Sequence, residues 1–197
     1  MTESGDSIAL TLEDSVQNWK IYETITKIVD KLALRFVDGG VYATELKAAG
    51  VSSPAPWTEI RDLPYLDAVI REALRVNPGI AMIFERVIPE DGFTLPDGRY
   101  LPAGTKAGIN PFVTNRDFGL FGGDADGFNP DRWLQGKDES SENFQIRLHR
   151  MKDTVDLSFG GGGRICMGWY LAMLEIQKLV ASLYSSFDYD MPMVIRR

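Results

Sequence analysis

FGGGGRICMG, at residues 159–168, contains the only cysteine of the chain, Cys166, which follows four consecutive glycines and an arginine. An apolar segment comes directly after the cysteine, and its spacing predicts a helix from about Met167 to Phe187. Four explanations fit such a loop: a phosphate-binding loop, a redox thiol, a metal ligand or a plain tight turn. Patterns elsewhere in the sequence distinguish between them.

The composition is that of an acidic globular chain. Its 197 residues are 44% hydrophobic and 25% charged, and the formal net charge is −7. A nucleic-acid-binding surface is normally basic, so this balance argues against a nucleic-acid partner. A single cysteine excludes an internal disulfide framework. No apolar run reaches the roughly 18 residues that span a bilayer, and the N-terminus has no signal-peptide pattern.

The glycines do not match either common phosphate-binding fingerprint. A dinucleotide fingerprint needs glycines at relative positions 1, 3 and 6. The sixth position here holds Ile165 or Cys166, depending on the glycine at which the count starts. A Walker A loop ends in Gly-Lys-Ser/Thr, whereas Gly168 precedes Trp169. We therefore set both nucleotide-binding interpretations aside.

Metal and thiol chemistry leave a smaller set of interpretations for Cys166. A zinc site needs four ligands, or three and a water, but the chain has one cysteine and one histidine, His149. A thiol nucleophile with His149 as its base and a buried, inert cysteine both remain open. Haem iron is a metal centre for which a single protein thiolate is enough, because the porphyrin supplies four ligands. Glycines and a helix N-terminus suit a thiolate, and Arg164 can pair with a propionate.

Two further patterns lie far from this loop in the sequence. Glu72 and Arg75, three residues apart in a helix predicted from Pro64 to Val76, lie on one face of that helix. Arg132 is flanked by proline and aromatic residues in the segment FNPDRW, 128–133. Each pattern alone is weak, because such pairs and loops are common on solvated surfaces.

The other segments predict a mainly α fold with a small antiparallel β-sheet, in the α+β class. Residues 14–37 have helical spacing, and Asp62 is a plausible N-cap of the Pro64 helix. Residues 117–158 have little periodicity and predict an irregular, partly helical excursion. The last helix is apolar on most sides, so we expect it to be buried. Strand signals around a Pro-Asp-Gly turn occur at 80–88, 93–95, 99–101 and 105–109.

Together, the three patterns resemble one family, the cytochrome P450s. FGGGGRICMG is similar to the family's haem-binding loop, Phe-x-x-Gly-x-Arg-x-Cys-x-Gly, at all five fixed positions. Glu72-x-x-Arg75 is similar to its Glu-x-x-Arg helix, and the segment around Arg132 to its Pro-x-Arg-aromatic loop. The resemblance has a fungal character and runs from about residue 5 to the end. It implies that residues 1–197 are a single partial domain, the haem-binding C-terminal portion of the P450 fold.

The resemblance implies a role for each residue of the haem site. Cys166 would be the axial ligand of the iron in a thiolate-ligated haem b, and Phe159 would pack beneath the haem. Arg164 and Arg86 would contact its propionates, and Gly168 completes the loop motif.

Two further groups of residues receive roles from the same resemblance. Glu72, Arg75 and Arg132 would form a buried structural triad that braces the haem loop, and its carboxylate can be bidentate on both sides. Asp6 and Ser7 resemble the remnant of a distal acid–alcohol pair that assists proton delivery, although their spacing is shorter than the family pattern.

The implied reaction is the reductive activation of dioxygen and the insertion of oxygen into a lipophilic organic substrate. The apolar residues Ile80 to Ile83 resemble the segment that lines the substrate side of the haem, but core packing explains them equally well. Electrons would come from an NADPH-cytochrome reductase or another donor. The basic segment RLHRMK, 147–152, either helps to dock an acidic reductase or is a solvated loop.

Two functions of different kinds are compatible with these patterns. One is a haem-thiolate monooxygenase, whose full-length eukaryotic relatives are anchored to the endoplasmic reticulum membrane and face the cytoplasm. The other is a non-catalytic, truncated or degenerate fragment of such an enzyme that keeps the haem-binding motifs. Members of the family are longer than this chain, which is why we keep the second function open.

Overall fold

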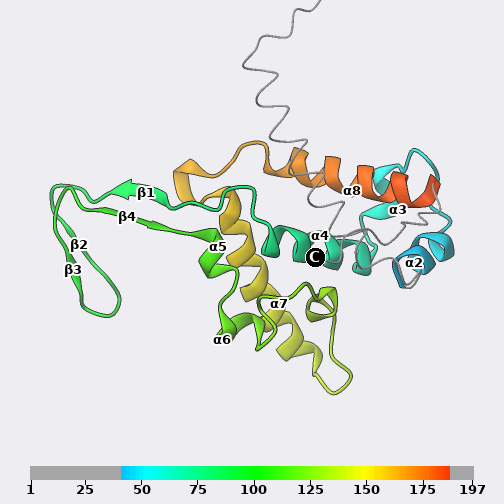
Figure 1. The fold of residues 1–197 in the computed structure, drawn as a ribbon, viewed down its shortest axis with the longest axis horizontal. Helices are drawn as coiled ribbons and strands as arrows, with labels where there is room; N and C mark the ends of the chain where they lie inside the picture. The colour runs from blue at the N-terminus through cyan, green and yellow to red at the C-terminus, as the bar shows by residue number, and fades with distance from the viewer. Residues whose placement is uncertain (1–40, 187–197) are drawn as a thin grey trace, which may run out of the picture.

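The computed structural model describes residues 41–186, which form a helical body with an arm of β-strands projecting from one side (Figure 1). The helix predicted at 14–37 and the predicted pair Asp6 and Ser7 lie outside the described residues. Helices with a small set of antiparallel strands confirm the predicted fold class.

In residues 41–186 the strands all lie between helices α4 and α5 in the sequence. The α-helices are α2 (Val41–Ala49), α3 (Trp57–Ile60), α4 (Pro64–Val76), α5 (Pro111–Thr114), α6 (Phe118–Phe121), α7 (Ser141–Asp156) and α8 (Trp169–Ser186). The strands are β1 (Phe84–Val87), β2 (Phe93–Thr94), β3 (Tyr100–Leu101) and β4 (Lys106–Ile109). Short 3-10 helices are η1 (Pro130–Trp133), η2 (Leu157–Phe159) and η3 (Gly162–Arg164).

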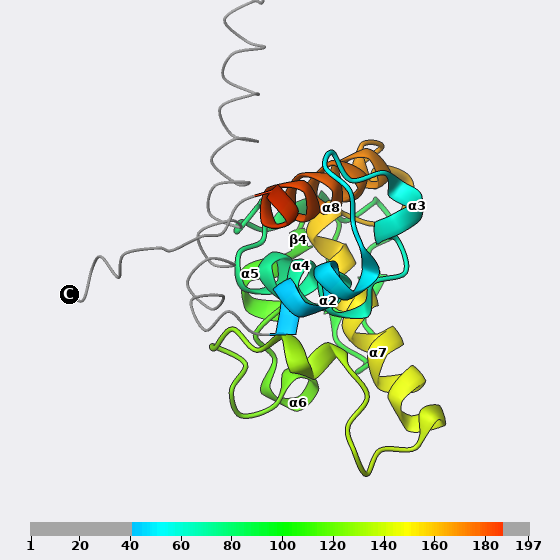
Figure 2. The same cartoon turned by 90° about the vertical axis from the view of Figure 1, so that its right-hand side faces the viewer.

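α4 is the central helix of the body, with α8 packed on one side and α7 on another (Figures 1 and 2). α2 and η1 also contact it. Fully burying an aliphatic side chain contributes about 1.5–3 kcal/mol, so α4 is the main anchor of the core. Its buried hydrophobic residues are Leu66, Ala68, Val69, Ile70, Ala73, Leu74 and Val76.

The N-terminus of α4 is capped by a side chain from another helix. Asp62 is not its N-cap; Leu63 holds that position and makes no side-chain hydrogen bond. Instead, the carboxylate of Glu45 in α2 accepts hydrogen bonds from the N–H groups of Tyr65 and Leu66, at 2.9 and 3.0 Å. A carboxylate also suits the positive end of the helix dipole. The cap therefore joins α2 to α4.

The arm consists of two antiparallel strand pairs (Figure 1). β1 pairs with β4 so that Phe84 lies opposite Ile109, and β2 pairs with β3 so that Phe93 lies opposite Leu101. They are two separate two-stranded sheets, whereas the sequence predicted one small sheet. Most of the strand residues are exposed, because no second layer covers a two-stranded ribbon among the described residues.

Residues 117–158 are more helical than predicted, because they include the 16-residue helix α7. Ser140 caps its N-terminus, and the helix buries only Met151 and Val155. Two buried positions make too sparse a stripe to predict a helix from periodicity. The segment RLHRMK, 147–152, lies within α7, so its interpretation as a solvated loop is wrong.

α8 is buried on one side only, in contrast to the burial predicted on most sides. Ile176, Val180 and Ala181 are buried where α8 meets α2, α3 and α4. Tyr170 and Leu171, near its start, are 79% and 59% exposed. Within residues 41–186, α8 and the other helices all lack the combination of length and apolar character that a bilayer crossing requires.

We expect Glu45→Ala to lower the free energy of unfolding by about 1–2 kcal/mol, because two N–H groups at the start of α4 lose their acceptor. Glu59→Ala is a matched control, since Glu59 accepts hydrogen bonds from Ser52 at an exposed position. The control should change stability by about 0.5 kcal/mol or less. Urea unfolding followed by circular dichroism measures both variants. Equal losses would contradict the capping role.

Candidate haem-thiolate site

The segment Phe159–Gly168, which we call the cysteine loop, joins η2 to α8. The N–H group of Cys166 donates a 2.8 Å hydrogen bond to the carbonyl group of Phe159, which closes the loop. α8 begins at Trp169, and the N–H group of Trp169 donates to the carbonyl group of Cys166 at 3.4 Å. Backbone hydrogen bonds therefore set the shape of the loop and hold the cysteine next to the start of a helix.

Two glycines have backbone conformations that the loop requires. Gly160 and Gly162 have φ values of 83° and 59°, in the left-handed region that side chains disfavour. A Cβ atom on Gly160 would lie 3.0 Å from the carbonyl oxygen of Arg164, which is unusually close. Gly163 has no positive φ, and no atom lies within 4 Å of a Cβ placed there. The four glycines therefore differ in importance.

Cys166 is exposed, so its interpretation as a buried, inert cysteine is wrong. A Cβ atom on Gly168 would lie 3.8 Å from Sγ, so glycine at that position leaves one side of the sulfur open. Ile165 and Met167 flank the cysteine and are 48% and 98% exposed. His149 lies in α7 and pairs with Asp153 at 3.3 Å. Within residues 41–186, no hydrogen bond or ion pair joins that histidine to the thiol.

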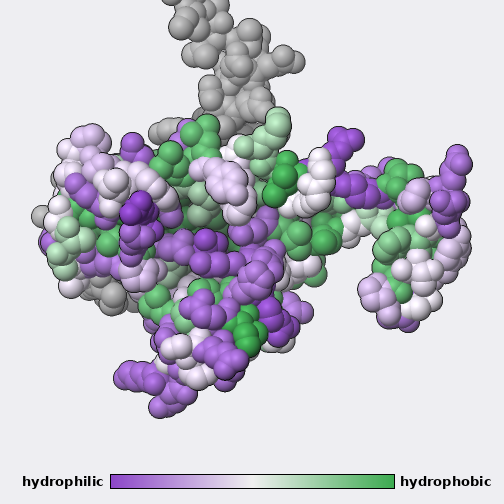
Figure 3. Space-filling model, turned by 180° about the vertical axis from the view of Figure 1, so that it is seen from behind, coloured by the Kyte–Doolittle hydropathy of each residue, from purple (hydrophilic) through white to green (hydrophobic). Residues whose placement is uncertain are grey.

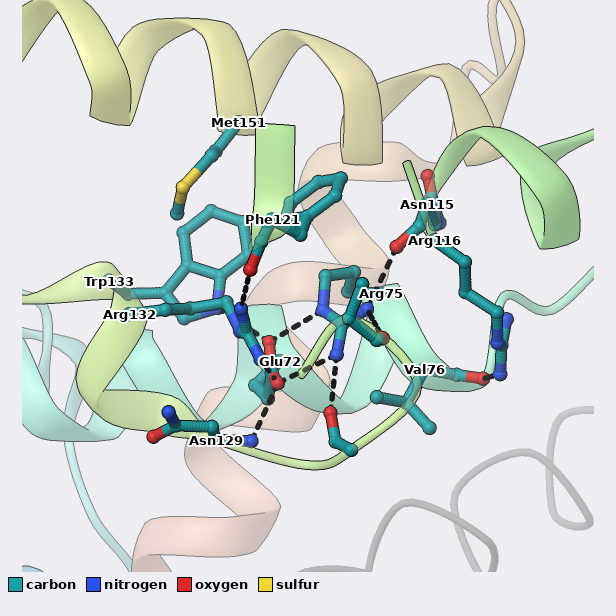
Figure 4. Close-up of polar contacts among 12 residues, drawn as sticks. Glu72, Arg75, Val76, Asn115, Arg116, Phe121, Asn129, Arg132, Trp133 and Met151 are labelled. Atoms are coloured by element: carbon teal, nitrogen blue, oxygen red, sulfur yellow. Dashed lines mark hydrogen bonds and ion pairs between the residues drawn. The ribbon is translucent and has the colours of Figure 1, made fainter. Parts of the chain in front are cut away.

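The second part of the site is a buried group of charges around Glu72, which we call the charge cluster (Glu72, Arg75 and Arg132; Figure 4). Arg75 donates two hydrogen bonds of 2.8 Å to the carboxylate, from Nε to Oε2 and from Nη2 to Oε1. Arg132 donates from Nε to Oε1 at 3.0 Å. The side chains of Glu72 and Arg75 are 0% exposed. The structure thus brings together three residues from two distant sequence patterns.

The carboxylate of Glu72 has more donors than the sequence predicted. The N–H group of Asn129 donates to Oε1 at 2.7 Å, and the indole Nε1 of Trp133 donates to Oε2 at 2.9 Å. Arg132 is therefore monodentate, because other donors occupy the remaining positions. Burial raises the pKa of Glu72, but the hydrogen bonds and charge of Arg75, with the Asn129 and Trp133 donors, lower it below its ordinary value.

Both arginines of the charge cluster also hold backbone segments. Arg75 donates three such bonds, at 2.8, 2.5 and 2.6 Å, to the carbonyl groups of Asn115, Ala125 and Gly127. Arg132 donates to the carbonyl groups of Phe121 and Asp124. The cluster therefore fixes the irregular segment between α5 and η1 onto α4. Removing one member leaves buried charges unpaired, which is costly.

The remaining predicted site residues lie in separate segments. Arg86 is exposed in β1, where its Nη1 donates to the carbonyl group of Glu85 at 2.8 Å. Arg164 is exposed at the end of η3. In the part of the chain that the structure describes, neither guanidinium forms an ion pair. Phe159 is partly buried and packs on Trp169, with ring centroids 6.2 Å apart.

Some residues of the site had no sequence prediction. Asn129 and Trp133 lie within FNPDRW, and the aromatic position of that pattern was the available signal for Trp133. Asn115 is fully buried. It precedes an arginine and an aspartate, and such a polar run is typical of an exposed turn. No pattern pointed to its burial.

Comparisons with known proteins agree on one family. The family model for cytochrome P450 matches residues 44–195. Cytochrome P450 monooxygenase cfoH of Aspergillus candidus is 44% identical over 146 residues, which are 74% of this chain and 27% of that protein. Monooxygenase mfmA of Annulohypoxylon moriforme is 39% identical over 186 residues, which are 93% of this chain and 32% of the relative.

A third relative, cytochrome P450 monooxygenase mpaDE of Penicillium roqueforti, is 44% identical over 186 residues, which are 93% of this chain and 20% of that protein. The chain therefore spans between a fifth and a third of the length of these three relatives. The extent of the domain, residues 1–197, stays a prediction.

Glu72→Gln should lower the free energy of unfolding by about 3–5 kcal/mol at neutral pH, because two buried guanidiniums lose their carboxylate. The pKa of Glu72 is depressed in the folded state, so its contribution is complete above the ordinary value of 4.5 and is lost as the pH falls through the folded value. The wild-type protein should therefore lose stability more steeply than the variant on acidification. Urea unfolding at a series of pH values measures this difference, and parallel profiles would refute it.

Gly160→Ala and Gly163→Ala form a matched pair within the cysteine loop. The first places a Cβ atom at positive φ against the Arg164 carbonyl group, and we expect a loss of about 1–3 kcal/mol. The second meets no atom and should change stability by about 0.5 kcal/mol or less. Thermal unfolding compares the two variants. Similar melting temperatures would show that the loop does not need the conformation seen at Gly160.

Proposed function

Because this chain belongs to the cytochrome P450 family, we propose that it is the haem-binding part of a monooxygenase and that Cys166 is the thiolate ligand of the haem iron. The observation that carries the proposal is the exposed Cys166 thiol in a loop whose backbone is fixed by hydrogen bonds. An exposed sulfur at the start of a helix suits a metal ligand better than a core residue.

The residues proposed for the site have the chemistry to hold a flat, largely apolar group with acidic substituents. Ile165 and Met167 offer apolar surface on both sides of Cys166. Arg86 and Arg164 are exposed cations without an ion pair among the described residues, so each is free to bind a carboxylate. We assign them to the two propionates of haem b. Phe159, packed on Trp169, would support the haem from the side of the cysteine.

The chain's own groups orient the ligand. The hydrogen bond from the Cys166 N–H to Phe159 fixes the backbone that carries the sulfur, and Gly168 keeps the approach to the sulfur open. Glycines at 160 and 162 allow the turn that makes this possible. A haem iron with a thiolate ligand supplies the reductive activation of dioxygen, because the thiolate donates electron density that favours O–O cleavage.

The charge cluster has a supporting role in this proposal. Both carboxylate oxygens of Glu72 already accept hydrogen bonds, and the side chain is fully buried. A carboxylate in this state has no access to a substrate, and its hydrogen bonds favour the ionised form. We therefore assign Glu72, Arg75 and Arg132 to the structure of the site and not to its chemistry.

The proposed substrate is lipophilic. Ile80, Met82 and Ile83 lie just before β1 and are 47%, 71% and 54% exposed, so three large apolar side chains that are close in sequence reach the surface. Hydrophobic residues gather where the arm leaves the body on the face that Figure 3 shows. We propose that this apolar surface lines the substrate side of the site, where oxygen is inserted into the substrate.

The proposed electron donor is an NADPH-cytochrome reductase or an equivalent protein. The segment RLHRMK on α7 contributes less to its docking than its sequence suggests, because two of its cations are already paired. Arg147 pairs with Glu139 at 2.8 Å, and Lys152 with Asp67 at 3.8 Å. Arg150 forms no ion pair within residues 41–186, and it is the cation of this segment that a reductase would meet.

Cys166→Ala should abolish the strongly red-shifted Soret band that a reduced, CO-treated haem protein shows when its ligand is a thiolate, because no other cysteine replaces it. Circular dichroism should stay unchanged, since the side chain is exposed. Glu59→Ala is the control, because Glu59 is exposed in α3, has no role in the proposed site and should keep the band when replaced. The absence of this band from the haem-loaded wild-type protein would overturn the ligand assignment.

The same variants test the reaction. With a reductase and a panel of lipophilic substrates, product that forms in step with NADPH consumption in the wild-type protein and is abolished in Cys166→Ala would support the monooxygenase. A thiolate Soret band without product from any substrate would instead favour a haem-binding protein without catalysis.

A further inference from the structure

One buried residue contacts both parts of the site. Asn115 follows α5 directly and is 0% exposed. Its carbonyl group accepts a 2.8 Å hydrogen bond from Nη1 of Arg75, as Figure 4 shows, and its side-chain Nδ2 donates a 3.1 Å bond to Oγ of Ser158. Asn115 therefore joins the charge cluster to η2.

Ser158 continues this connection to the cysteine. It is 7% exposed and directly precedes the cysteine loop. Phe159, the next residue, accepts the hydrogen bond from the N–H group of Cys166 at 2.8 Å. Hydrogen bonds thus connect Glu72 to Arg75, Arg75 to Asn115, and Asn115 to Ser158. The peptide bond from Ser158 to Phe159 and the hydrogen bond from the Cys166 N–H group to Phe159 complete the path.

We propose that Asn115 is a positioning residue, which sets the place of the cysteine loop relative to α4 through its bond to Ser158. The internal bonds of the loop fix its shape, but they do not fix where the loop lies. An ion pair between Arg71 and Asp156, at 3.7 Å, also ties the end of α7 to α4, but both partners are partly exposed. This inference rests on the proposed function, because the place of the loop matters for ligation by Cys166.

The side-chain carbonyl oxygen of Asn115, which accepts no hydrogen bond among the described residues, supports this role. This atom, Oδ1, is buried. A buried polar atom without a partner costs about 1–3 kcal/mol. A position that only filled the core would be more stable with an apolar side chain of similar size. The use of asparagine here is explained by the bond that its Nδ2 donates to Ser158.

Hydrogen exchange at the Cys166 amide tests the proposal in the haem-free protein. Ser158→Ala removes the acceptor with little change in volume, and the amide should exchange roughly tenfold faster, the equivalent of one lost buried hydrogen bond. Asn115→Ala should give a similar increase. The double variant should exchange no faster than either single variant, because both changes remove the same bond.

Ser140→Ala is the matched control for Ser158→Ala. It removes one serine hydrogen bond at the far end of α7, where Ser140 accepts from the N–H group of Asn143. Exchange at Cys166 should then stay at the wild-type rate. Wild-type exchange in Ser158→Ala would overturn the proposal, and so would additive effects in the double variant. Ser158→Ala alone decides the matter if Asn115→Ala does not fold.

A second readout uses the haem-loaded protein. The fraction that shows the thiolate Soret band after reduction and CO treatment should fall in Asn115→Ala and Ser158→Ala, and not in Ser140→Ala. An equal fraction in all the variants would count against positioning. If the haem-loaded wild-type protein shows no thiolate band, the proposed function fails, and hydrogen exchange still decides the role of Asn115.

Discussion

The buried carboxylate of Glu72 is the group on which the arrangement of the described structure depends. Burial of an unpaired charge costs several kcal/mol, yet this carboxylate stays ionised because guanidinium, indole and backbone donors surround it. Arg75 and Arg132 extend its influence, since they also bind carbonyl groups between residues 115 and 127. α6 lies in that segment and α5 directly before it, and these two helices have four residues each, too few to be stable alone. Charge-assisted hydrogen bonds from the arginines keep these short helices against the body. A longer helix would be held there by a stripe of hydrophobic residues.

Sequence patterns predicted the parts of the fold that local forces determine. α4 was predictable because it has a wide apolar stripe and a proline in its first turn, and the β2–β3 turn because proline and glycine fix its backbone. α7 was missed because only Met151 and Val155 face the core. The cap of α4 was missed because Glu45 is 20 residues away from Tyr65, and no local pattern records a contact between separate helices.

The candidate site divides in the same way. The cysteine loop and the members of the charge cluster could be grouped from the sequence only through their resemblance to the motifs of one family, because each pattern alone is weak. The additional donors to Glu72 from Asn129 and Trp133 depend on how η1 folds against α4. The contact between Asn115 and Ser158 is one side-chain hydrogen bond across 43 positions. Such a bond leaves no periodicity and no motif, so only the three-dimensional structure reveals it.

The exposure of Cys166 has a consequence for the behaviour of the chain in air. Because this chain has no second cysteine, it cannot form an intramolecular disulfide. The exposed Cys166 can form a disulfide only with another molecule, such as a second copy of the chain. Further oxidation of an accessible sulfur leads to sulfinic and sulfonic acids, which thiol reductants do not restore. A sulfur bound to iron is shielded from both reactions. Under the proposed function, occupancy of the site and protection from covalent dimerisation would therefore be two results of the same bond.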